Sequence, residues 1–326
     1  MRTIDWVFDD AGAGIEIVEQ TLLPGQTRLV RLRTVPEVVD AIVRLAVRGA
    51  PALGVAGAMG VALAAHRRGT TDGLDADVEA LRSARPTAVN LARGVDRVAA
   101  VLPAGVDAVV AEALAVRDEE IASSAAMATI GADLVTSLTG PSPRILTHCN
   151  TGGLATVTGG TALSVVTELH RRGALRDVVV SETRPLLQGA RLTAWELGEA
   201  GVTFRVAVDS AGPYLMARGE VDLVILGADR VCANGDVVNK VGTYAHALGA
   251  ARAGIPFVVV APESTVDNDT ACGADVPIED RSGDEVLGVA GQRIAPDGAA
   301  AVNPAFDVTP HDLVTAIVTD RRVIRP

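Results

Sequence analysis

Lysine, aromatic residues and cysteine are all scarce in this chain of 326 residues. Aromatic residues make up 2% of the sequence and hydrophobic residues 48%, so we expect a large core built from Ala, Val and Leu. The three cysteines are an odd number without metal-site spacing, which argues against a disulfide framework and favours a reducing cytoplasm. We interpret two of them, Cys232 and Cys272, as structural.

Basic runs and long hydrophobic runs are also missing. The net charge is −11 and no basic run is interleaved with aromatics, which argues against a nucleic-acid partner. The opening segment, MRTIDWVFDD, does not read as a signal peptide. The longest apolar run, Ala50 to Ala65, has 16 residues, whereas a membrane span needs roughly 18 or more, so this run predicts a buried helix. We therefore expect a cytoplasmic protein without a membrane partner.

Patterns typical of metal and dinucleotide sites are absent as well. No HxxH, CxxC or acidic cluster is present. The glycine pairs at 152–153 and 159–160 do not form a GxGxxG fingerprint. Four histidines are scattered, mostly on expected helices, and we interpret them as solvated or packed: His66, His170, His246 and His311. The sequence therefore predicts neither a metal nor a cofactor.

The scarcity of lysine makes the one that is present informative. Lys240 is the only lysine, and all the others among the 29 basic residues are arginines. Position 240 is therefore expected to need a compact ammonium, which binds phosphate as a point charge. The apolar strand expected at 221–226 leads into a polar loop, which holds Asp229 and a turn at 234–236. Asn239 and Lys240 close that loop at the expected start of the next helix; the alternative is a leftover surface lysine.

Strands and helices alternate in the second half of the chain, which predicts a doubly wound parallel sheet. The expected strands are 144–150, 178–181, 203–208, 221–226 and 256–261, and the expected helices are 161–172, 189–200, 213–218 and 244–253. Before the break at 140–143 the chain is expected to be mainly helical, with two strands around a turn within 13–33, a capped helix from Thr34, a loop at 70–80 and a long helix at 106–138.

Two arginines in the first half are candidate anion ligands. Arg48 precedes Gly49, which we expect in a left-handed C-cap, and Pro51, which starts the next helix. The first amides of that helix, with Arg48 beside them, would bind an anion, although an ordinary helix–helix turn has the same pattern. Arg85 precedes another helix and is either a phosphate or sugar ligand or a solvated neighbour of the helix cap.

Polar side chains follow four of the expected strands, where parallel sheets place their ligands. They are Cys149-Asn150, Glu182-Thr183-Arg184, Asp209-Ser210 and Asp229-Arg230. We expect Asp229 to be poorly solvated between small neighbours and suited to acid–base work. The amides after Cys149 would lower its thiol pKa, although a free cysteine is also a common small buried hydrophobe. These residues predict a cofactor-free enzyme acting on a small phosphorylated substrate; a pure binding protein is the competing class.

Several longer motifs resemble one family closely. They are RGAPALG at 48–54, RPTAVNL at 85–91, THCN at 147–150, ETRPLLQGARLTAWEL at 182–197, GADR at 227–230, NGD at 234–236, NKVGTY at 239–244 and NPAFDVTP at 303–310. Together they are similar to S-methyl-5-thioribose-1-phosphate isomerase, from about residue 20 to the end. That family belongs to a superfamily with the regulatory subunits of the translation-initiation guanine-exchange factor.

The resemblance implies an aldose–ketose isomerase of methionine salvage that converts 5-methylthioribose 1-phosphate to 5-methylthioribulose 1-phosphate. It implies that Asp229 is the proton donor and Cys149 a transition-state or proton-transfer partner. Hydrogen transfer through a phosphoenolate and transfer by a hydride shift both remain open. The implied substrate-binding residues are Arg48, Gly49, Ala50, Arg85, Gln188, Asn239 and Lys240.

The resemblance also implies the domain organisation. A mainly helical N-terminal domain with a small β element, residues 1–123, would precede a Rossmann-like doubly wound parallel-sheet domain, residues 124–326, with the boundary inside the long helix before 140. A homodimer is expected. Thr151 and Gly153 depart from the family pattern beside Cys149, so relatives acting on 5-deoxyribose 1-phosphate or ribose 1,5-bisphosphate stay as alternatives. A non-catalytic regulatory relative would lack Cys149 or Asp229, and both are present.

Overall fold

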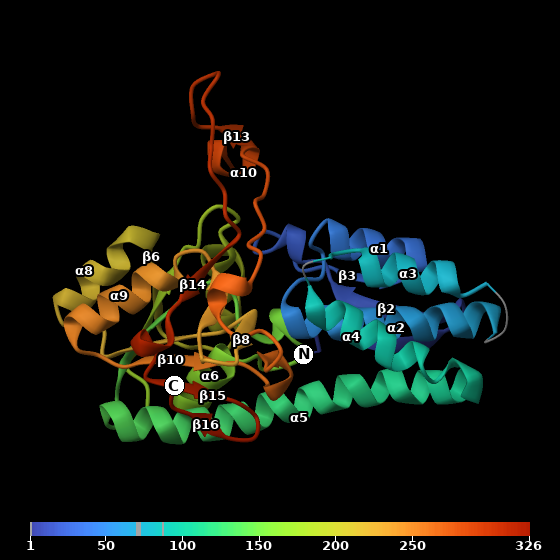
Figure 1. The fold of residues 1–326 in the computed structure, drawn as a ribbon, viewed down its shortest axis with the longest axis horizontal. Helices are drawn as coiled ribbons and strands as arrows, with labels where there is room; N and C mark the ends of the chain where they lie inside the picture. The colour runs from blue at the N-terminus through green and yellow to red at the C-terminus, as the bar shows by residue number, and fades with distance from the viewer. Residues whose placement is uncertain (1, 70–72, 87) are drawn as a thin grey trace. The chain divides into compact units, whose positions relative to one another are not determined.

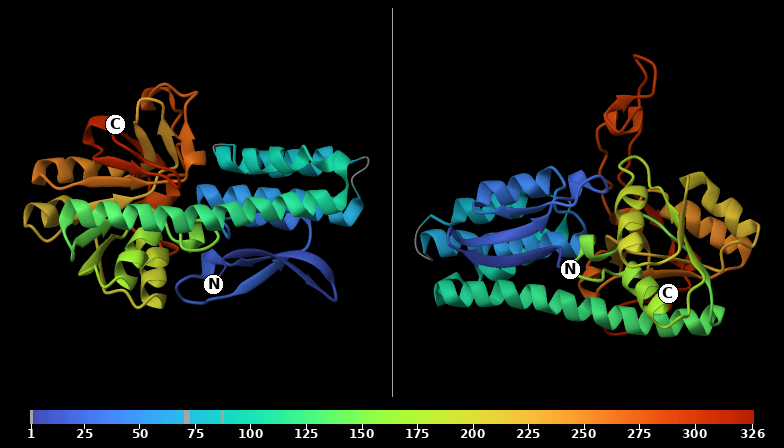
Figure 2. Two further views of the ribbon diagram at one scale, coloured as in Figure 1. Left: turned by 90° about the horizontal axis from the view of Figure 1, so that it is seen from below. Right: turned by 180° about the vertical axis from the view of Figure 1, so that it is seen from behind.

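The computed structural model describes residues 2–69, 73–86 and 88–326. The chain forms two compact units. The first consists of Met1–Ala125 with Gly152–Gly160, and the second of Ala126–Thr151 with Thr161–Pro326. One helix, α5 (Val106–Thr139), belongs partly to each unit and is drawn as one unbroken helix in both views of Figure 2.

The first unit combines a small antiparallel sheet with helices, as Figure 1 shows in blue and cyan. The sheet has the order β1-β2-β3, and two of its strands are those expected within 13–33. Its elements are β1 (Ile4–Asp9), β2 (Gly12–Val18), η1 (Gln20–Leu22), β3 (Leu29–Leu32), α1 (Val35–Val43), α2 (Ala50–Arg68), α3 (Asp75–Ser83), α4 (Val89–Ala99), η2 (Leu102–Ala104), the start of α5 and η3 (Gly153–Ala155).

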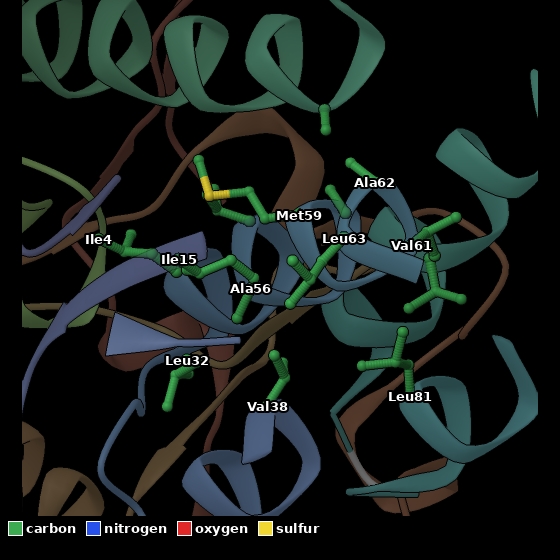
Figure 3. Packing of buried hydrophobic residues seen from close by; sticks show 14 of the residues in the cluster. Ile4, Ile15, Leu32, Val38, Ala56, Met59, Val61, Ala62, Leu63 and Leu81 are labelled. Atoms are coloured by element: carbon green, nitrogen blue, oxygen red, sulfur yellow. The ribbon is translucent and has the colours of Figure 1, made fainter. Parts of the chain in front are cut away.

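The buried helix predicted from the apolar run at 50–65 is confirmed as α2. Its residues from Ala52 to Ala65 are all buried, so the helix is apolar on every side. Figure 3 shows α2 side chains such as Leu63 among residues from the neighbouring strands and helices. Close packing depends on small residues, because a Cβ at Gly94 of α4 would lie 2.1 Å from the carbonyl oxygen of Gly54.

Two expectations for the first unit are wrong. Helix α1 ends at Val43, and Leu45, with φ 66°, takes the left-handed conformation that we assigned to Gly49. Gly49 is instead the N-cap of α2. The expected loop at 70–80 contains the start of α3 from Asp75; residues 70–72 lie outside the described residues. The helix forms there because Leu74 and Leu81 are buried, which gives the segment an apolar stripe that its polar composition conceals.

A seven-stranded sheet forms the centre of the second unit and confirms the predicted α/β fold. Its order is β16-β15-β10-β7-β4-β5-β6, and all neighbours are parallel except β15 and β16. Counted in chain order, the six parallel strands run 3-2-1-4-5-6, the arrangement of dinucleotide-binding folds. The strands are β4 (Arg144–Thr147), β5 (Asp177–Ser181), β6 (Phe204–Ala207), β7 (Leu223–Leu226), β10 (Phe257–Val260), β15 (Ala316–Val318) and β16 (Val323–Ile324).

Apolar residues cover both faces of this sheet, as its continuous hydrophobic strands predict. Ile145 and its counterparts on neighbouring strands pack with α5, α6 and α7, whereas Leu146 and its counterparts pack with α8 and α9. The bounds are α6 (Ala162–Arg171), the π-helical turn η4 (Gly189–Thr193), α7 (Ala194–Glu199), η5 (Asp209–Ala211), α8 (Gly212–Ala217) and α9 (Thr243–Ala253).

A second sheet, with the order β11-β8-β9-β14, replaces the loop that we expected after residue 226. The turn at 234–236 is confirmed, but it joins two strands, and Lys240 ends β9 rather than starting a helix. A long excursion with α10 and β13 at its far end projects from the rest of this unit in Figure 1. The bounds are β8 (Arg230–Cys232), β9 (Val237–Lys240), η6 (Glu263–Thr265), β11 (Val266–Asp267), η7 (Gly273–Asp275), α10 (Asp284–Leu287), β12 (Gly288–Val289), β13 (Gln292–Arg293), β14 (Phe306–Thr309) and η8 (His311–Leu313).

Helix α5 is by length and composition apolar enough to cross a membrane. One such helix is weak evidence for a membrane span, because long core helices of soluble proteins meet the same criteria. Its buried residues Val109 and Ala113 pack in the first unit, and Met127 and Val135 pack in the second. The helix therefore contributes to the cores of both units.

Candidate active site

Cys149 and Asp229 follow two neighbouring strands of the central sheet. Cys149 comes two residues after β4, and Asp229 three residues after β7, which pairs with β4. These strands flank the point where the strand order reverses, where open α/β sheets bind their ligands. Cys149 is buried, with 7% of its surface exposed, and Asp229 is exposed. The expectation that Asp229 is poorly solvated is therefore wrong, because the hairpin beyond it leaves its side chain open to water.

The backbone at Cys149 is left-handed, with φ 60°. Its amide donates a hydrogen bond to Thr183 Oγ1 at 2.9 Å, and its carbonyl oxygen accepts one from Thr193 Oγ1 at 2.6 Å. The next residue, Asn150, donates through Nδ2 to Glu196 Oε1 at 2.7 Å. Residues of the motif at 182–197 thus bind the amide and the carbonyl oxygen of Cys149 and the side chain of Asn150.

The polar residues after β5 and β6 bind one another. The carboxylate of Asp209 accepts hydrogen bonds from the amides of Thr183 and Arg184, both at 2.7 Å, and from the Ser181 hydroxyl. Arg184 Nη2 donates to the carbonyl oxygens of three residues in the projecting segment: Glu285 at 3.2 Å, Val286 at 3.0 Å and Gly288 at 3.2 Å. Asp209 is thus bound to Ser181 and to two backbone amides, and the expectation that the four strand ends outline one pocket stays a prediction.

Gln188 lies above the end of β5. It is 6% exposed and follows Leu187, whose φ is 59°. Gly189 comes so close to β5 that a Cβ there would lie 1.8 Å from the carbonyl oxygen of Ser181. Gln188 Oε1 is buried and has no hydrogen-bond partner within the part of the chain that the structure describes. An orphaned buried acceptor at this edge of the sheet fits a ligand donor.

Asn239 and Lys240 end β9 beside the start of α9. Asn239 is buried and donates to Thr243 Oγ1 at 2.9 Å, and that hydroxyl donates to the carbonyl oxygen of Lys240 at 2.6 Å. Lys240 is half-buried, and its Nζ donates to the carbonyl oxygen of Ala305 at 2.6 Å and lies 4.5 Å from the ring centre of Phe306. The ammonium is therefore held in one orientation by Ala305, which precedes β14, and by Phe306, the first residue of β14.

Asp307 of β14 caps the start of α9. Its carboxylate accepts hydrogen bonds from the amides of Gly242 at 2.7 Å and Tyr244 at 3.2 Å. Burial raises the pKa of Asp307 to about 6, against the opposing effects of the two amides and of Lys240. In the sequence, Asp307 stands out only as part of the motif at 303–310, so no role was predicted for it.

Arg48, Gly49, Ala50 and Arg85 belong to the first unit. The first three are half-buried at the start of α2. Gly49 has φ 98°, and a Cβ there would lie 2.5 Å from both Cα and the carbonyl oxygen of Ala155 in the same unit, so only glycine fits. The N-terminus of α2 beside Arg48 has the geometry expected of an anion site.

Arg85 belongs to the segment between α3 and α4. It is half-buried and precedes α4, as predicted. Helices α2 and α4 pack closely at their amino ends, since a Cβ at Gly54 would lie 3.1 Å from the carbonyl oxygen of Asn90. Arg48 and Arg85 are the candidate anion ligands of the first unit. Their role in binding remains a prediction.

The interpretation of His246 as packed is confirmed, because it is 1% exposed and lies against the buried ring of His148. The rings of His148 and His246 meet edge to face, 5.0 Å apart. His148 Nε2 bonds with the carbonyl oxygen of Val241 at 2.9 Å, and His246 Nε2 with Ser181 Oγ at 3.2 Å. Burial lowers the pKa of His148 to about 4 and that of His246 to about 3, so both are neutral at pH 7.

Groups of acidic, histidine and cysteine side chains that could hold a metal were not found among residues 2–69, 73–86 and 88–326. Cys232 is buried, and burial raises the pKa of its thiol to about 11, which agrees with the structural interpretation.

Comparison with known proteins gives consistent similarities. A family model described as "Initiation factor 2 subunit family" matches residues 46–326. The chain is 51% identical to the methylthioribose-1-phosphate isomerase of Anaeromyxobacter dehalogenans, over 98% of this chain and 93% of the relative. It is 48% identical to the 5-deoxyribose 1-phosphate isomerase of Moorella thermoacetica, over 96% of this chain and 92% of the relative.

Another relative is longer than this chain. A probable bifunctional methylthioribose-1-phosphate isomerase/methylthioribulose-1-phosphate dehydratase of Nocardia farcinica is 54% identical over 99% of this chain, which spans only 60% of that protein. Among solved structures, 5-methylthioribose 1-phosphate isomerase from Pyrococcus horikoshii OT3 superposes with a TM-score of 0.92 at 42% identity. That similarity covers 100% of this chain and 92% of the other.

Proposed function

This chain belongs to the Initiation factor 2 subunit family, and on that premise we propose that it isomerises 5-methylthioribose 1-phosphate to 5-methylthioribulose 1-phosphate. It is an intramolecular oxidoreductase of the aldose–ketose type, and its reaction belongs to methionine salvage. The observation that carries the proposal is the pair Cys149 and Asp229, a thiol and a carboxyl at the ends of adjacent strands β4 and β7. A non-catalytic relative has no need of both groups at that position.

The substrate explains why two ionisable groups are needed. Its anomeric oxygen carries the phosphate, so an open-chain aldehyde is not available before the ring is broken. In our proposal Asp229 donates a proton to the ring oxygen as the bond from that oxygen to C1 breaks. One hydrogen then moves from C2 to C1, and the C2 hydroxyl loses its proton to become the ketone. Cys149 assists that transfer, either by carrying the proton through a phosphoenolate or by stabilising a hydride shift.

We assign substrate binding to the remaining candidates by their chemistry. The ammonium of Lys240 is a point charge for the phosphate, and the orphaned Oε1 of Gln188 is an acceptor for a sugar hydroxyl. Asn239 holds the end of β9 through Thr243 and supports Lys240. Arg48 and Arg85 are guanidinium donors suited to phosphate, and Gly49 and Ala50 supply the helix N-terminus.

The relative that acts on 5-deoxyribose 1-phosphate makes that sugar the second candidate substrate. The two sugars share the phosphate and the reacting carbons and differ only at C5. Thr151 and Gly153, which depart from the family pattern next to Cys149, are the positions where such a preference could arise.

The test is turnover of the purified enzyme on 5-methylthioribose 1-phosphate, 5-deoxyribose 1-phosphate and ribose 1,5-bisphosphate, with Cys149→Ser measured alongside. We expect the methylthio sugar to have the highest kcat/KM and the variant to lose that activity. A higher kcat/KM on another of these sugars would support the proposed isomerisation but contradict its assignment to methionine salvage. A folded wild-type protein inactive on all three would refute the proposed function.

We also propose a cytoplasmic location, a homodimer and a division into folding domains near residue 123. The first is supported by the odd number of cysteines in the sequence, three, and by the metabolic role of the relatives. Sedimentation of the purified protein tests the dimer: a single species near 33.4 kDa, the mass of one chain, would contradict it.

A further inference from the structure

Cys149 has a backbone conformation that its own side chain does not favour. Residues with a Cβ rarely adopt φ near 60°, so contacts from outside must hold Cys149 there. The contact to its amide is the hydroxyl of Thr183, at 2.9 Å. This bond joins the segment after β4 to the segment after β5.

Thr183 is itself left-handed, with φ 67°, and is fixed by Asp209. The amide of Thr183 donates to Asp209 Oδ1 at 2.7 Å, and the amide of Arg184 donates to Oδ2 at 2.7 Å. Ser181 donates its hydroxyl to the same carboxylate. Burial raises the pKa of Asp209, but these three hydrogen bonds outweigh burial and bring the pKa below its usual value, so the carboxylate stays charged.

The hydroxyl of Thr183 is oriented to accept from Cys149. A hydroxyl has one proton, and that of Thr183 is directed to the carbonyl oxygen of Ser181, 2.9 Å away. Its lone pairs then face the Cys149 amide, and His148 Nδ1 lies 3.4 Å from the same oxygen. Thr183 is fully buried, so it does not touch substrate.

We propose that Asp209 and Thr183 are positioning residues for Cys149: the carboxylate fixes the left-handed turn at Thr183, and its hydroxyl fixes the left-handed turn at Cys149. The inference rests on the proposed function for its kinetic consequence, since it concerns the thiol that assists isomerisation. Its structural part, the left-handed backbone at Cys149, stands on the contacts alone. A turn that merely contributes to folding would make the same bonds without affecting the chemistry of the thiol.

Two substitutions separate these possibilities. Thr183→Val keeps the branched shape and removes the hydroxyl, whereas Thr183→Ser keeps the hydroxyl and removes a methyl group. The control is Thr315→Val. Thr315 is exposed, unlike Thr183, but its Oγ1 also accepts a backbone hydrogen bond, from Phe257 at 2.9 Å, at the opposite ends of the strands. Asp209→Asn tests the carboxylate if Thr183→Val does not fold.

We expect kcat of Thr183→Val to fall about 10- to 100-fold with KM changed less than about threefold, because a misplaced catalytic group lowers turnover more than binding. Thr183→Ser should recover kcat to within about threefold of the wild type, and Thr315→Val should match the wild type. Equal kcat in Thr183→Val and the wild type, or equal losses in Thr183→Val and Thr315→Val, would overturn the proposal. The same comparison applies to Asp209→Asn.

The reactivity of the thiol gives a readout that does not depend on the substrate. The rate of iodoacetamide alkylation at Cys149, followed by mass spectrometry of its peptide from pH 6 to 10, should give one profile for the wild type and Thr183→Ser and a shifted one for Thr183→Val. Coincident profiles for all three would overturn the proposal even in an active enzyme. Shifted profiles in a protein inactive on every sugar phosphate would support positioning and reject the proposed function.

Discussion

The amide of Asp229 donates a hydrogen bond to the carbonyl oxygen of Val238, at 3.0 Å. Val238 lies in β9, two residues before Lys240. The end of β7 is thereby tied to the strand that carries the single lysine of the chain. This hydrogen bond joins backbone atoms, so substitutions of the Asp229 and Lys240 side chains leave it in place. Such substitutions can therefore test proton transfer and substrate binding separately.

Asp229→Asn should abolish proton donation while the protein stays folded. The side chain is exposed, so the amide is accommodated without a packing cost. We expect kcat to fall about 10²- to 10⁴-fold, the usual contribution of a general acid or base. Steady-state kinetics with Asp312→Asn, another exposed carboxylate, provides the comparison. Near wild-type turnover in Asp229→Asn would remove Asp229 from the mechanism.

Lys240→Ala should raise KM more than it lowers kcat. A charged hydrogen bond to phosphate contributes about 1.5–3 kcal/mol, which corresponds to about a 10- to 100-fold rise in KM. Lys240→Arg should recover only part of the loss, because the planar guanidinium cannot reproduce a point charge placed by Ala305 and Phe306. Unchanged KM in Lys240→Ala, with folding checked by circular dichroism, would make the lysine a purely structural contact.

Gly49→Ala should destabilise the first unit far more than Gly69→Ala. Both glycines flank α2 with positive φ, at 98° and 81°, so each substitution carries strain of about 1–3 kcal/mol. Only at Gly49 does the new Cβ overlap backbone, 2.5 Å from Cα of Ala155, whereas nothing lies within 4 Å at Gly69. We expect urea unfolding to show an additional loss of about 1–3 kcal/mol for Gly49→Ala. Equal losses would mean that the approach to Ala155 relaxes without cost.

The buried histidines should make the folded protein sensitive to acid. Burial lowers the pKa of His148 to about 4 and that of His246 to about 3, whereas an unfolded histidine titrates near 6.5. Between those values the unfolded chain binds more protons, so the free energy of unfolding falls as pH decreases below about 6.5. Each histidine contributes a slope of up to about 1.4 kcal/mol per pH unit down to its folded pKa.

His246→Gln isolates this effect. Its amide nitrogen replaces Nε2 beside Ser181 but does not titrate. Urea midpoints measured at pH 7.5, 6 and 5 should fall less steeply in the variant than in the wild type. Parallel curves would show that His246 is not a source of acid sensitivity.

Much of the fold was predictable because apolar patterning is a local signal. The strands from 144 to 261 are short, continuous apolar runs between turn signals, and their alternation with helices predicts a parallel sheet. The chain after residue 261 gave no such signal. Strand β14 forms only against β9, and the short β15 forms between β10 and β16, so neither is evident from its own sequence.

The candidate site divides in the same way. The positions of Cys149 and Asp229 follow from strand ends, which the sequence marks by a change from apolar to polar residues. The exposure of the Asp229 side chain does not follow from the strand ends, because that exposure depends on the path of β8 and β9 after Asp229. Asp209 looked like a pocket residue in the sequence. Its partners are two backbone amides and one hydroxyl, and such donors leave no pattern in the sequence.

The pairing of β9 with β14 also sets an order of events during synthesis. Lys240 and Phe306 face each other in this ladder, and the oxygen that holds the ammonium belongs to Ala305. A nascent chain released up to residue 300 would already carry Cys149, Asp229 and Lys240 while β9 remained an open sheet edge, a site prone to wrong pairing. The ribosome therefore has to deliver residues 305 and 306 before the lysine is placed, so translation stalled before them would leave an inactive, association-prone product.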